Sequence, residues 1–248
     1  MKIAVCVSHV PDTATKIKVA PDGKTIDKNG VTFIVNPYDE FAIEEALKTK
    51  EKFGGETFVL SVGGEANKET IRKALAMGID NGILLKDEKP RDSYSVSIAL
   101  AEAIKTLGCD IVFMGKQSVD FDNSIIGQLT AELLNYSCIS TVVDLKVENN
   151  KVTAEREIEG GREIVEAELP IVITCQKGLN EPRYASLKGI MTAKKKIIEE
   201  KPAASAENRC EILRMYNPPP KNPGRILGTD ASAVPELVRL LREEAKVI

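Results

Sequence analysis

Glycine and polar side chains gather in one stretch, residues 115–126, that could hold a phosphate-bearing ligand. The stretch reads Gly-Lys-Gln-Ser-Val-Asp-Phe-Asp-Asn-Ser-Ile-Ile and follows an apolar segment, 110–114. A glycine lets the backbone approach a ligand closely, and a helix beginning after such a loop offers free N–H groups to a phosphate. Lys116 supplies positive charge, and Ser118 and Ser124 supply neutral donors. The residue types of this stretch therefore indicate a nucleotide site.

Two carboxylates in this stretch, Asp120 and Asp122, are open to two interpretations. They could bind the hydroxyls of a ribose, or they could cap the helix that follows. The chain contains neither Gly-x-Gly-x-x-Gly nor Gly-x-x-x-x-Gly-Lys-Ser/Thr, so the common dinucleotide and P-loop patterns are absent. The pattern predicts an adenine nucleotide site of unspecified kind.

Strands and helices alternate in the half of the chain that must position this stretch. Short apolar runs predict strands at 3–7, 57–62, 82–85 and 110–114. Capping residues and glycines predict helices between and after these strands. Three begin at Asn36-Pro37, near Asp92-Ser93 and after Asp122-Asn123, and another contains Ile71 and ends at Gly78. The last helix turns Ile126, Leu129 and Leu133 inward. This order predicts an α/β, Rossmann-like fold whose mainly parallel sheet has helices on both faces.

Ligands of an open parallel sheet bind beyond the carboxyl ends of its strands. Four segments are expected to meet there. They are the end of the first strand near Cys6, the helix start at 36–39, the turn at 61–64 and the stretch 115–126.

The second half of the chain has a different character. Residues 152–158 and 163–169 flank Gly160-Gly161 and predict a β-hairpin, which Pro170 separates from an apolar strand. Beyond it, 199–248 contains a proline-rich extended stretch and a last amphipathic helix. We expect a nucleotide-binding domain over 1–198 and, over 199–248, a C-terminal arm and helix that embrace a partner.

The segment 177–196 combines loop-forming residues with apolar side chains. Gly178, Pro182 and Gly189 break any long periodic element, and a lysine cluster closes the segment. Apolar residues within it include Leu179, Tyr184, Leu187, Ile190 and Met191. Such a segment is either a docking surface for another protein or a loop folded back on its own core.

Composition excludes several classes of function. The net charge is −3, which gives no strong basic field for binding nucleic acid, and no apolar run approaches the roughly 20 residues that cross a bilayer. The first residues are typical of a strand rather than a signal peptide, so we expect a cytoplasmic protein without membrane insertion. Five scattered cysteines indicate reduced thiols. With the single histidine, His9, neither a metal site nor a hydrolytic triad is expected.

Three segments together resemble the β subunit of electron transfer flavoproteins. They are Leu-Asn-Glu-Pro-Arg-Tyr-Ala-Ser-Leu with its following lysines, the run Ala154 to Thr174 with its acidic-Gly-Gly turn, and the loop Gly-Lys-Gln-Ser-Val-Asp-Phe-Asp. The resemblance covers most of the chain and implies an adenine nucleotide alpha hydrolase-like fold. It also implies a structural AMP on this chain and FAD carried mainly by an α subunit. The chain would then be a non-catalytic electron-carrier subunit that docks an acyl-CoA dehydrogenase or related flavin dehydrogenase, as in fatty acid oxidation.

The same resemblance assigns site residues position by position. Cofactor contacts are assigned to Cys6, Asn36, Pro37, Tyr38, Asp39, Val62, Gly115, Lys116, Gln117, Ser118, Val119, Asp120, Phe121, Asp122, Asn123, Ser124, Ile125 and Ile126. Partner contacts are assigned to Tyr184, Leu187, Ile190 and Met191, with Leu187 as the anchor. No catalytic or metal-ligating residue is implied.

Two other functions compete with this one. Some relatives bifurcate electrons, carry a second FAD on the β chain in place of AMP and oxidise NADH there. This chain has the bulky Phe121 in the same loop, and it has Gln128 where those relatives have proline. Both differences favour AMP over a second FAD. A free-standing nucleotide-binding module of the universal-stress or ATP-pyrophosphatase type would share the sheet, but it leaves 177–196 and the C-terminal arm without a role.

Overall fold

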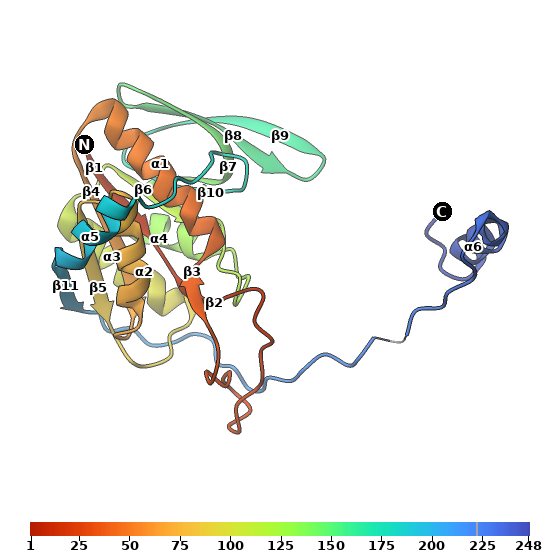
Figure 1. The fold of residues 1–248 in the computed structure, drawn as a ribbon. Coiled ribbons are helices and arrows are strands. Elements are labelled where there is room, and N and C mark those ends of the chain that lie inside the picture. The colour runs from red at the N-terminus through yellow and green to blue at the C-terminus, as the bar shows by residue number, and fades with distance from the viewer. Residues whose placement is uncertain (222) are drawn as a thin grey trace.

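The computed structural model describes residues 1–221 and 223–248 and centres on one large sheet (Figure 1). Within these residues the sheet has nine strands in the order β11-β5-β4-β1-β6-β10-β7-β8-β9. From β11 to β7 all neighbours run parallel, and β8 and β9 add an antiparallel edge. The strands are β1 Lys2–Cys6, β4 Glu56–Gly63, β5 Asn81–Lys86, β6 Ile111–Gly115, β7 Ser137–Glu148, β8 Lys151–Ile158, β9 Gly161–Glu168, β10 Ile171–Cys175 and β11 Ile198–Pro202.

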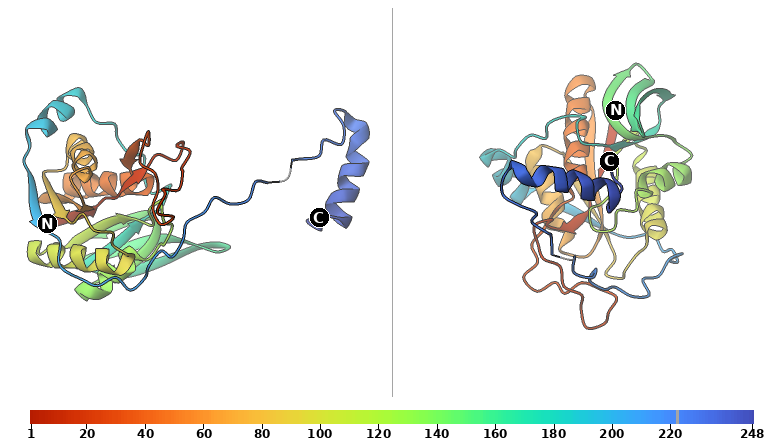
Figure 2. Two further views of the ribbon diagram at one scale, coloured as in Figure 1. Left: turned by 90° about the horizontal axis from the view of Figure 1, so that it is seen from below. Right: turned by 90° about the vertical axis from the view of Figure 1, so that its right-hand side faces the viewer.

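Helices cover both faces of the sheet, as the views in Figure 2 show. One face carries α1 Pro37–Phe53, α2 Asn67–Met77 and α5 Leu187–Lys195, and the other carries α3 Ser93–Leu107 and α4 Ile126–Leu134. Both faces need cover because successive side chains of a strand point to opposite faces. In β1, Ile3 and Val5 pack on the face of α1, α2 and α5, whereas Ala4 and Cys6 pack on the face of α3 and α4. The predicted α/β, Rossmann-like arrangement is confirmed.

The chain reverses its direction of travel across the sheet beside β1. From β1 it proceeds through α1, β4, α2 and β5 toward one edge, and α3 then carries it back to β6 on the other side of β1. The carboxyl ends of β1 and β6 therefore flank a topological switch point, the usual place for a ligand in an open parallel sheet.

A long strand and a hairpin extend the opposite edge. β7 pairs with β10 and with β8, and β8 pairs with β9 along its whole length. The predicted hairpin is present, but its turn consists of Glu159 and Gly160, since Ile158 already pairs with Gly161. Only Gly160 of the two glycines has a positive φ, 80°.

A small second sheet lies near the first strand. β2 His9–Pro11 pairs antiparallel with β3 Phe33–Val35. The His9 ring stacks on Phe33 with centroids 4.8 Å apart, and its Nδ1 is 2.8 Å from the hydroxyl of Thr70. His9 therefore has a structural role in packing this insertion.

The C-terminal part begins inside the sheet and leaves it only later. β11 pairs with β5, so the sheet continues to Pro202, past residue 198. The Asp92 carboxylate then accepts hydrogen bonds from the backbone N–H groups of Arg209 and Cys210, at 2.6 and 2.9 Å. The Met215 N–H donates to the carbonyl of Gly23. Residues 203–216 are thus tied to the body.

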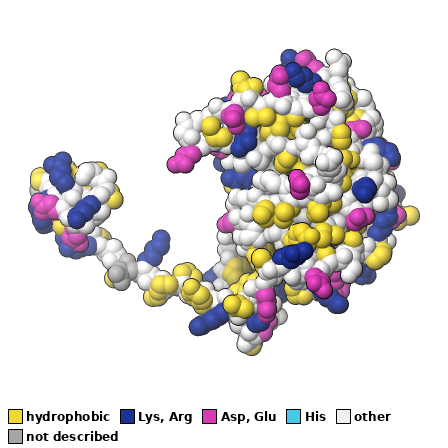
Figure 3. Space-filling view, turned by 180° about the vertical axis from the view of Figure 1, so that it is seen from behind, with side chains coloured by type: hydrophobic (Ala, Val, Ile, Leu, Met, Phe, Trp, Pro, Cys, Tyr) yellow, Lys and Arg dark blue, Asp and Glu magenta, His cyan; other side chains and the backbone are white. Residues whose placement is uncertain are grey.

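Beyond this tied part the arm stands away from the body (Figures 1 and 3). It ends in a 3-10 turn, η1 Ala231–Ala233, and the helix α6 Val234–Glu243, which has no buried residue. Hydrophobic side chains lie along the stretch between body and helix in Figure 3. No helix in the described part of the chain is long and apolar enough to cross a membrane.

Candidate functional site

The first turn of α1 ties together the two strand ends at the switch point. The carboxylate of Asp39 accepts hydrogen bonds from the backbone N–H of Ser8, after β1, at 2.7 Å, and of Gly115, at the end of β6, at 3.0 Å. The side-chain amide of Asn36 donates to the same carboxylate at 3.0 Å. Burial raises the pKa of Asp39 to about 7, and these three donors oppose the rise.

Asn36 also fixes the loop that follows β6. Its amide N–H donates to the carbonyl of Gln117 at 2.8 Å, and its carbonyl oxygen accepts from the N–H of Val119 at 3.1 Å. Asn36 is fully buried. The side chains of Asn36 and Asp39, two of the predicted site residues, are therefore engaged in shaping the loop.

The loop itself, 115–125, is held by its own polar side chains. The amide of Gln117 donates to Asp122 at 2.5 Å and accepts from the hydroxyl of Ser124 at 2.7 Å. Asp122 and Ser124 both have positive φ, 53° and 50°. Positive φ is uncommon outside glycine, and this network offsets its cost.

The capping role considered for Asp120 and Asp122 is wrong. The N-cap of α4 is Ile125, and no side chain accepts a hydrogen bond from the first turn of that helix. Asp120 accepts from the N–H of Phe121 instead. The N–H groups at the start of α4 therefore remain free of side-chain caps, which suits a phosphate.

The remaining predicted cofactor residues surround this loop. Cys6 ends β1 and is buried, so the pKa of its thiol lies well above the ordinary value. Val62 lies near the end of β4. The ammonium of Lys116 lies 5.0 Å from the ring centre of Tyr38. Phe121, like its neighbours in the loop, is exposed.

This arrangement suits a phosphate-bearing ligand. Lys116, the hydroxyl of Ser118 and an uncapped helix start belong to the loop at the switch point, and a phosphate and a ribose bind to groups of these kinds. One expected packing residue of α4 is placed differently. Leu133 is exposed, and the buried face of α4 consists of Gly127, Thr130 and Ala131 because Gly127 lies against Thr174 of β10.

A second region, the segment 177–196, presents apolar side chains to solvent and is called the docking segment after its predicted role. Tyr184 is 99% exposed and Leu187 is 79% exposed, and Ile190 and Met191 are exposed to lesser degrees. Part of the segment is the helix α5, which Ser186 caps by accepting a hydrogen bond from the N–H of Gly189 at 3.0 Å. Part of the segment folds back on its own core, as the second interpretation predicted, because Leu179 and Ala185 pack there.

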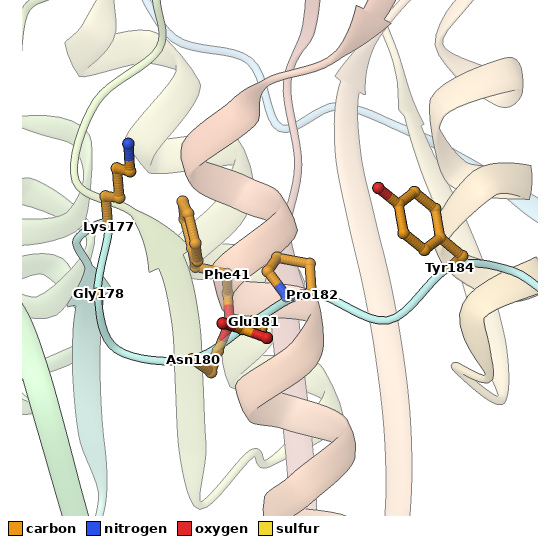
Figure 4. Close-up of a pocket in the computed structure, with 7 residues that line it drawn as sticks. All are labelled: Phe41, Lys177, Gly178, Asn180, Glu181, Pro182 and Tyr184. Carbon is orange, nitrogen blue, oxygen red and sulfur yellow. The ribbon is translucent and has the colours of Figure 1, made fainter.

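A cavity of about 460 Å³ lies between the docking segment and α1 (Figure 4). Phe41 and Pro182 face each other across it, with Lys177 and Tyr184 at its two ends. The cavity borders the docking segment and contains none of the predicted cofactor residues. Among the described residues, no cluster of side chains could hold a metal ion.

Sequence reasoning missed the residues that anchor the docking segment. Arg183 forms ion pairs with Glu44 and Glu51 of α1, and Asn180 donates to Glu45. Glu44 and Glu45 are buried. The signal was present in the sequence, because two adjacent glutamates occupy the apolar face of a helix whose other buried residues include Ile43, Ala46 and Leu47.

Comparison with known proteins gives one consistent family. The model of the electron transfer flavoprotein domain matches residues 23–206. The chain is 40% identical to the electron transfer flavoprotein subunit beta of Bacillus subtilis (strain 168) and 39% identical to that of Bradyrhizobium diazoefficiens. It is 36% identical to the mitochondrial subunit beta of Arabidopsis thaliana. Each of these three matches covers 100% of both chains.

Proposed function

This chain belongs to the electron transfer flavoprotein family as a β subunit, and we propose that it binds AMP and docks dehydrogenases for an electron-carrying heterodimer. Its partner in that heterodimer is an α subunit, which carries the FAD that accepts and delivers electrons. The chain is then a subunit of an electron carrier rather than an enzyme in its own right. The proposal divides the work between two regions of this chain.

The nucleotide region is the switch point between β1 and β6. The observation that carries the proposal is the positioning of the loop 115–125 by Asn36 and Asp39, which leaves backbone donors and the start of α4 for a ligand. AMP bound there has its phosphate near free N–H groups and its ribose near the side chains of the loop. AMP has no redox-active ring, so in this proposal it ties segments of this chain together and transfers no electrons.

The docking region is the segment 177–196. Its exposed apolar residues, with Leu187 as the anchor, contact an acyl-CoA dehydrogenase or a related flavin dehydrogenase. An apolar anchor within a polar rim is typical of interfaces that form and dissociate repeatedly. The arm beyond residue 216 contacts the α subunit, because α6 has an apolar side and no buried residue on its own chain.

The test is electron delivery to the heterodimer. The chain is co-expressed with its α subunit, and the absorbance of the bound flavin is followed after an acyl-CoA dehydrogenase and its substrate are added. Rapid loss of the oxidised flavin spectrum, with no reduction by NADH alone, supports the carrier function. Reduction by NADH alone identifies the bifurcating form, with its chemistry on a second FAD, and contradicts the proposal.

A further inference from the structure

We infer that Arg183 and Glu44 form a positioning clamp that holds the docking segment in the orientation its partner recognises. The inference rests on the proposed docking function and adds to it the residues that act behind the contact surface. Neither residue needs to touch the partner for the clamp to work. Its effect comes through the conformation of the segment that carries Tyr184 and Leu187.

The contact between the two residues is specific in geometry. The Nε of Arg183 donates to Oε2 of Glu44, and Nη2 donates to Oε1, both at 2.8 Å. The backbone N–H of Arg183 donates to Oε2 as well, at 3.1 Å. Glu44 is only 4% exposed. A two-pronged, partly buried pair of this kind is stronger and more directional than a surface ion pair.

Other contacts from α1 support the same part of the segment, which Figure 4 shows crossing that helix. Asn180 donates to the carbonyl of Phe41 at 3.0 Å and to the carboxylate of Glu45 at 2.9 Å. The second edge of the Arg183 guanidinium reaches the more exposed Glu51 at 2.5 Å. The first half of the docking segment is therefore tied to α1 at two successive points.

The far end of the segment is tied to a different helix. Arg72 of α2 donates to the carbonyls of Ala193 and Lys196, at 2.8 and 3.3 Å, and the ammonium of Lys196 reaches the carbonyl of Ile79 at 2.6 Å. The exposed Leu187 and Met191 lie between the two attachments. These apolar side chains bury little of their own surface, so their position is set by the two attachments and by the packing of α5 against α2, where Gly189 lies on the backbone of Ala76.

A docking segment that is attached at both ends lowers the free-energy cost of binding a partner. A segment already fixed in its bound conformation loses less conformational entropy when a partner binds. Loss of one of the two guanidinium hydrogen bonds of Arg183 leaves the buried Glu44 incompletely paired. It also frees the first half of the docking segment. The nucleotide loop is expected to keep its conformation, since Asn36 and Asp39, which hold it, lie at the start of α1 and more than one helical turn before Glu44.

The experiment uses the heterodimer with Arg183→Lys, and with Glu44→Gln as a second change to the same pair. Arg162→Lys, which alters an exposed ion pair with Glu155 on the hairpin, is the matched control. Hydrogen exchange of the peptides from 178–192 and the KM and kcat for the dehydrogenase are measured, with the content of FAD and of released nucleotide. We expect about tenfold faster exchange and an about tenfold higher KM in both clamp variants, with kcat and cofactor content unchanged.

The outcomes separate the clamp from the docking function on which it rests. Exchange and KM that match the wild-type values in both clamp variants overturn the clamp. Faster exchange with an unchanged KM also overturns it, provided that Leu187→Ala raises KM in the same assay. If Leu187→Ala leaves KM unchanged, the docking function itself fails, and the clamp fails with it.

Discussion

Gly115 donates its backbone N–H to the carboxylate of Asp39 at 3.0 Å, and the same approach leaves no room for a side chain at Gly115. A Cβ there would overlap the Asp39 carboxylate and both the side chain and the backbone of Tyr38. The end of β6 and the start of α1 are therefore in direct contact. This contact gives the nucleotide region its shape.

Gly115→Ala is expected to destabilise the subunit and to expel its nucleotide. The added methyl group meets backbone and a buried carboxylate rather than the flexible end of a side chain, and such overpacking costs about 1–3 kcal/mol. The melting temperature of the heterodimer and the nucleotide released on denaturation are the measurements. Gly161→Ala is the control, because a Cβ at that position meets nothing within 4 Å. Equal melting temperatures and nucleotide contents in the two variants would show that the contact is dispensable.

Asp39 should make stability depend on pH below neutrality. Burial raises its pKa to about 7 in the folded chain, so between its ordinary value and 7 the folded state holds more protons than the unfolded state. The contribution of Asp39 to the free energy of unfolding is therefore fully present below its pKa in the unfolded chain. It falls as the pH rises to 7, by up to about 1.4 kcal/mol per pH unit.

Asp39→Asn isolates this effect, although it also lowers stability at every pH because its NH₂ group faces a hydrogen-bond donor. The melting temperatures of wild-type and variant heterodimers are compared at pH 5 and pH 8. The advantage of the wild type is expected to be larger at pH 5. An advantage that is constant or grows toward pH 8 would contradict a raised pKa for Asp39 in the folded chain.

Leu187→Ala should weaken docking without disturbing the heterodimer. The side chain is mostly exposed, so its removal costs little folding energy, whereas loss of a central anchor reduces affinity by about tenfold or more. The KM for the dehydrogenase is the measurement, with FAD content as the check on integrity. Ile164→Ala removes a similarly exposed apolar side chain from the hairpin and serves as control. Equal KM values for the two variants would remove Leu187 from the interface.

Truncation before Asn217 should loosen the pairing with the α subunit and leave this chain folded. Residues 203–216 keep their ties to Asp92 and Gly23, so the cut removes only the part that stands away from the body. Co-purification with a tagged α subunit after a salt wash measures the effect. Leu237→Glu places a charge on the exposed apolar side of α6 and should act in the same direction. Full co-purification of both variants would assign the arm another role.

Much of the fold was predictable because its signals are local. Apolar runs mark the central strands, and Asn36-Pro37, Asp92 and Gly108 mark helix ends where the structure has them. The strands β7 and β11 escaped prediction for a physical reason. Both contain several exposed polar residues, and their strand conformation depends on tertiary pairing, of β7 with β10 and β8 and of β11 with β5.

The candidate site was predictable in place but not in detail. Strand order brings residues 36–39 and 115–126 to the carboxyl ends of β1 and β6, and the sequence indicates that end of the sheet. The choice of partners depends on tertiary contacts: Asn36 bonds to residues more than 80 positions away, and Arg183 to one 139 positions away. Polar groups that the sequence assigns to a ligand or a cap are therefore found holding the chain itself together.

The central claim is that this subunit carries AMP while the α subunit carries the flavin. The most direct measurement is the identity and amount of nucleotide released when the purified heterodimer is denatured, determined by mass spectrometry against known standards. We predict one FAD and one AMP for each heterodimer. Two FAD and no AMP would contradict the account and would place redox chemistry on this chain.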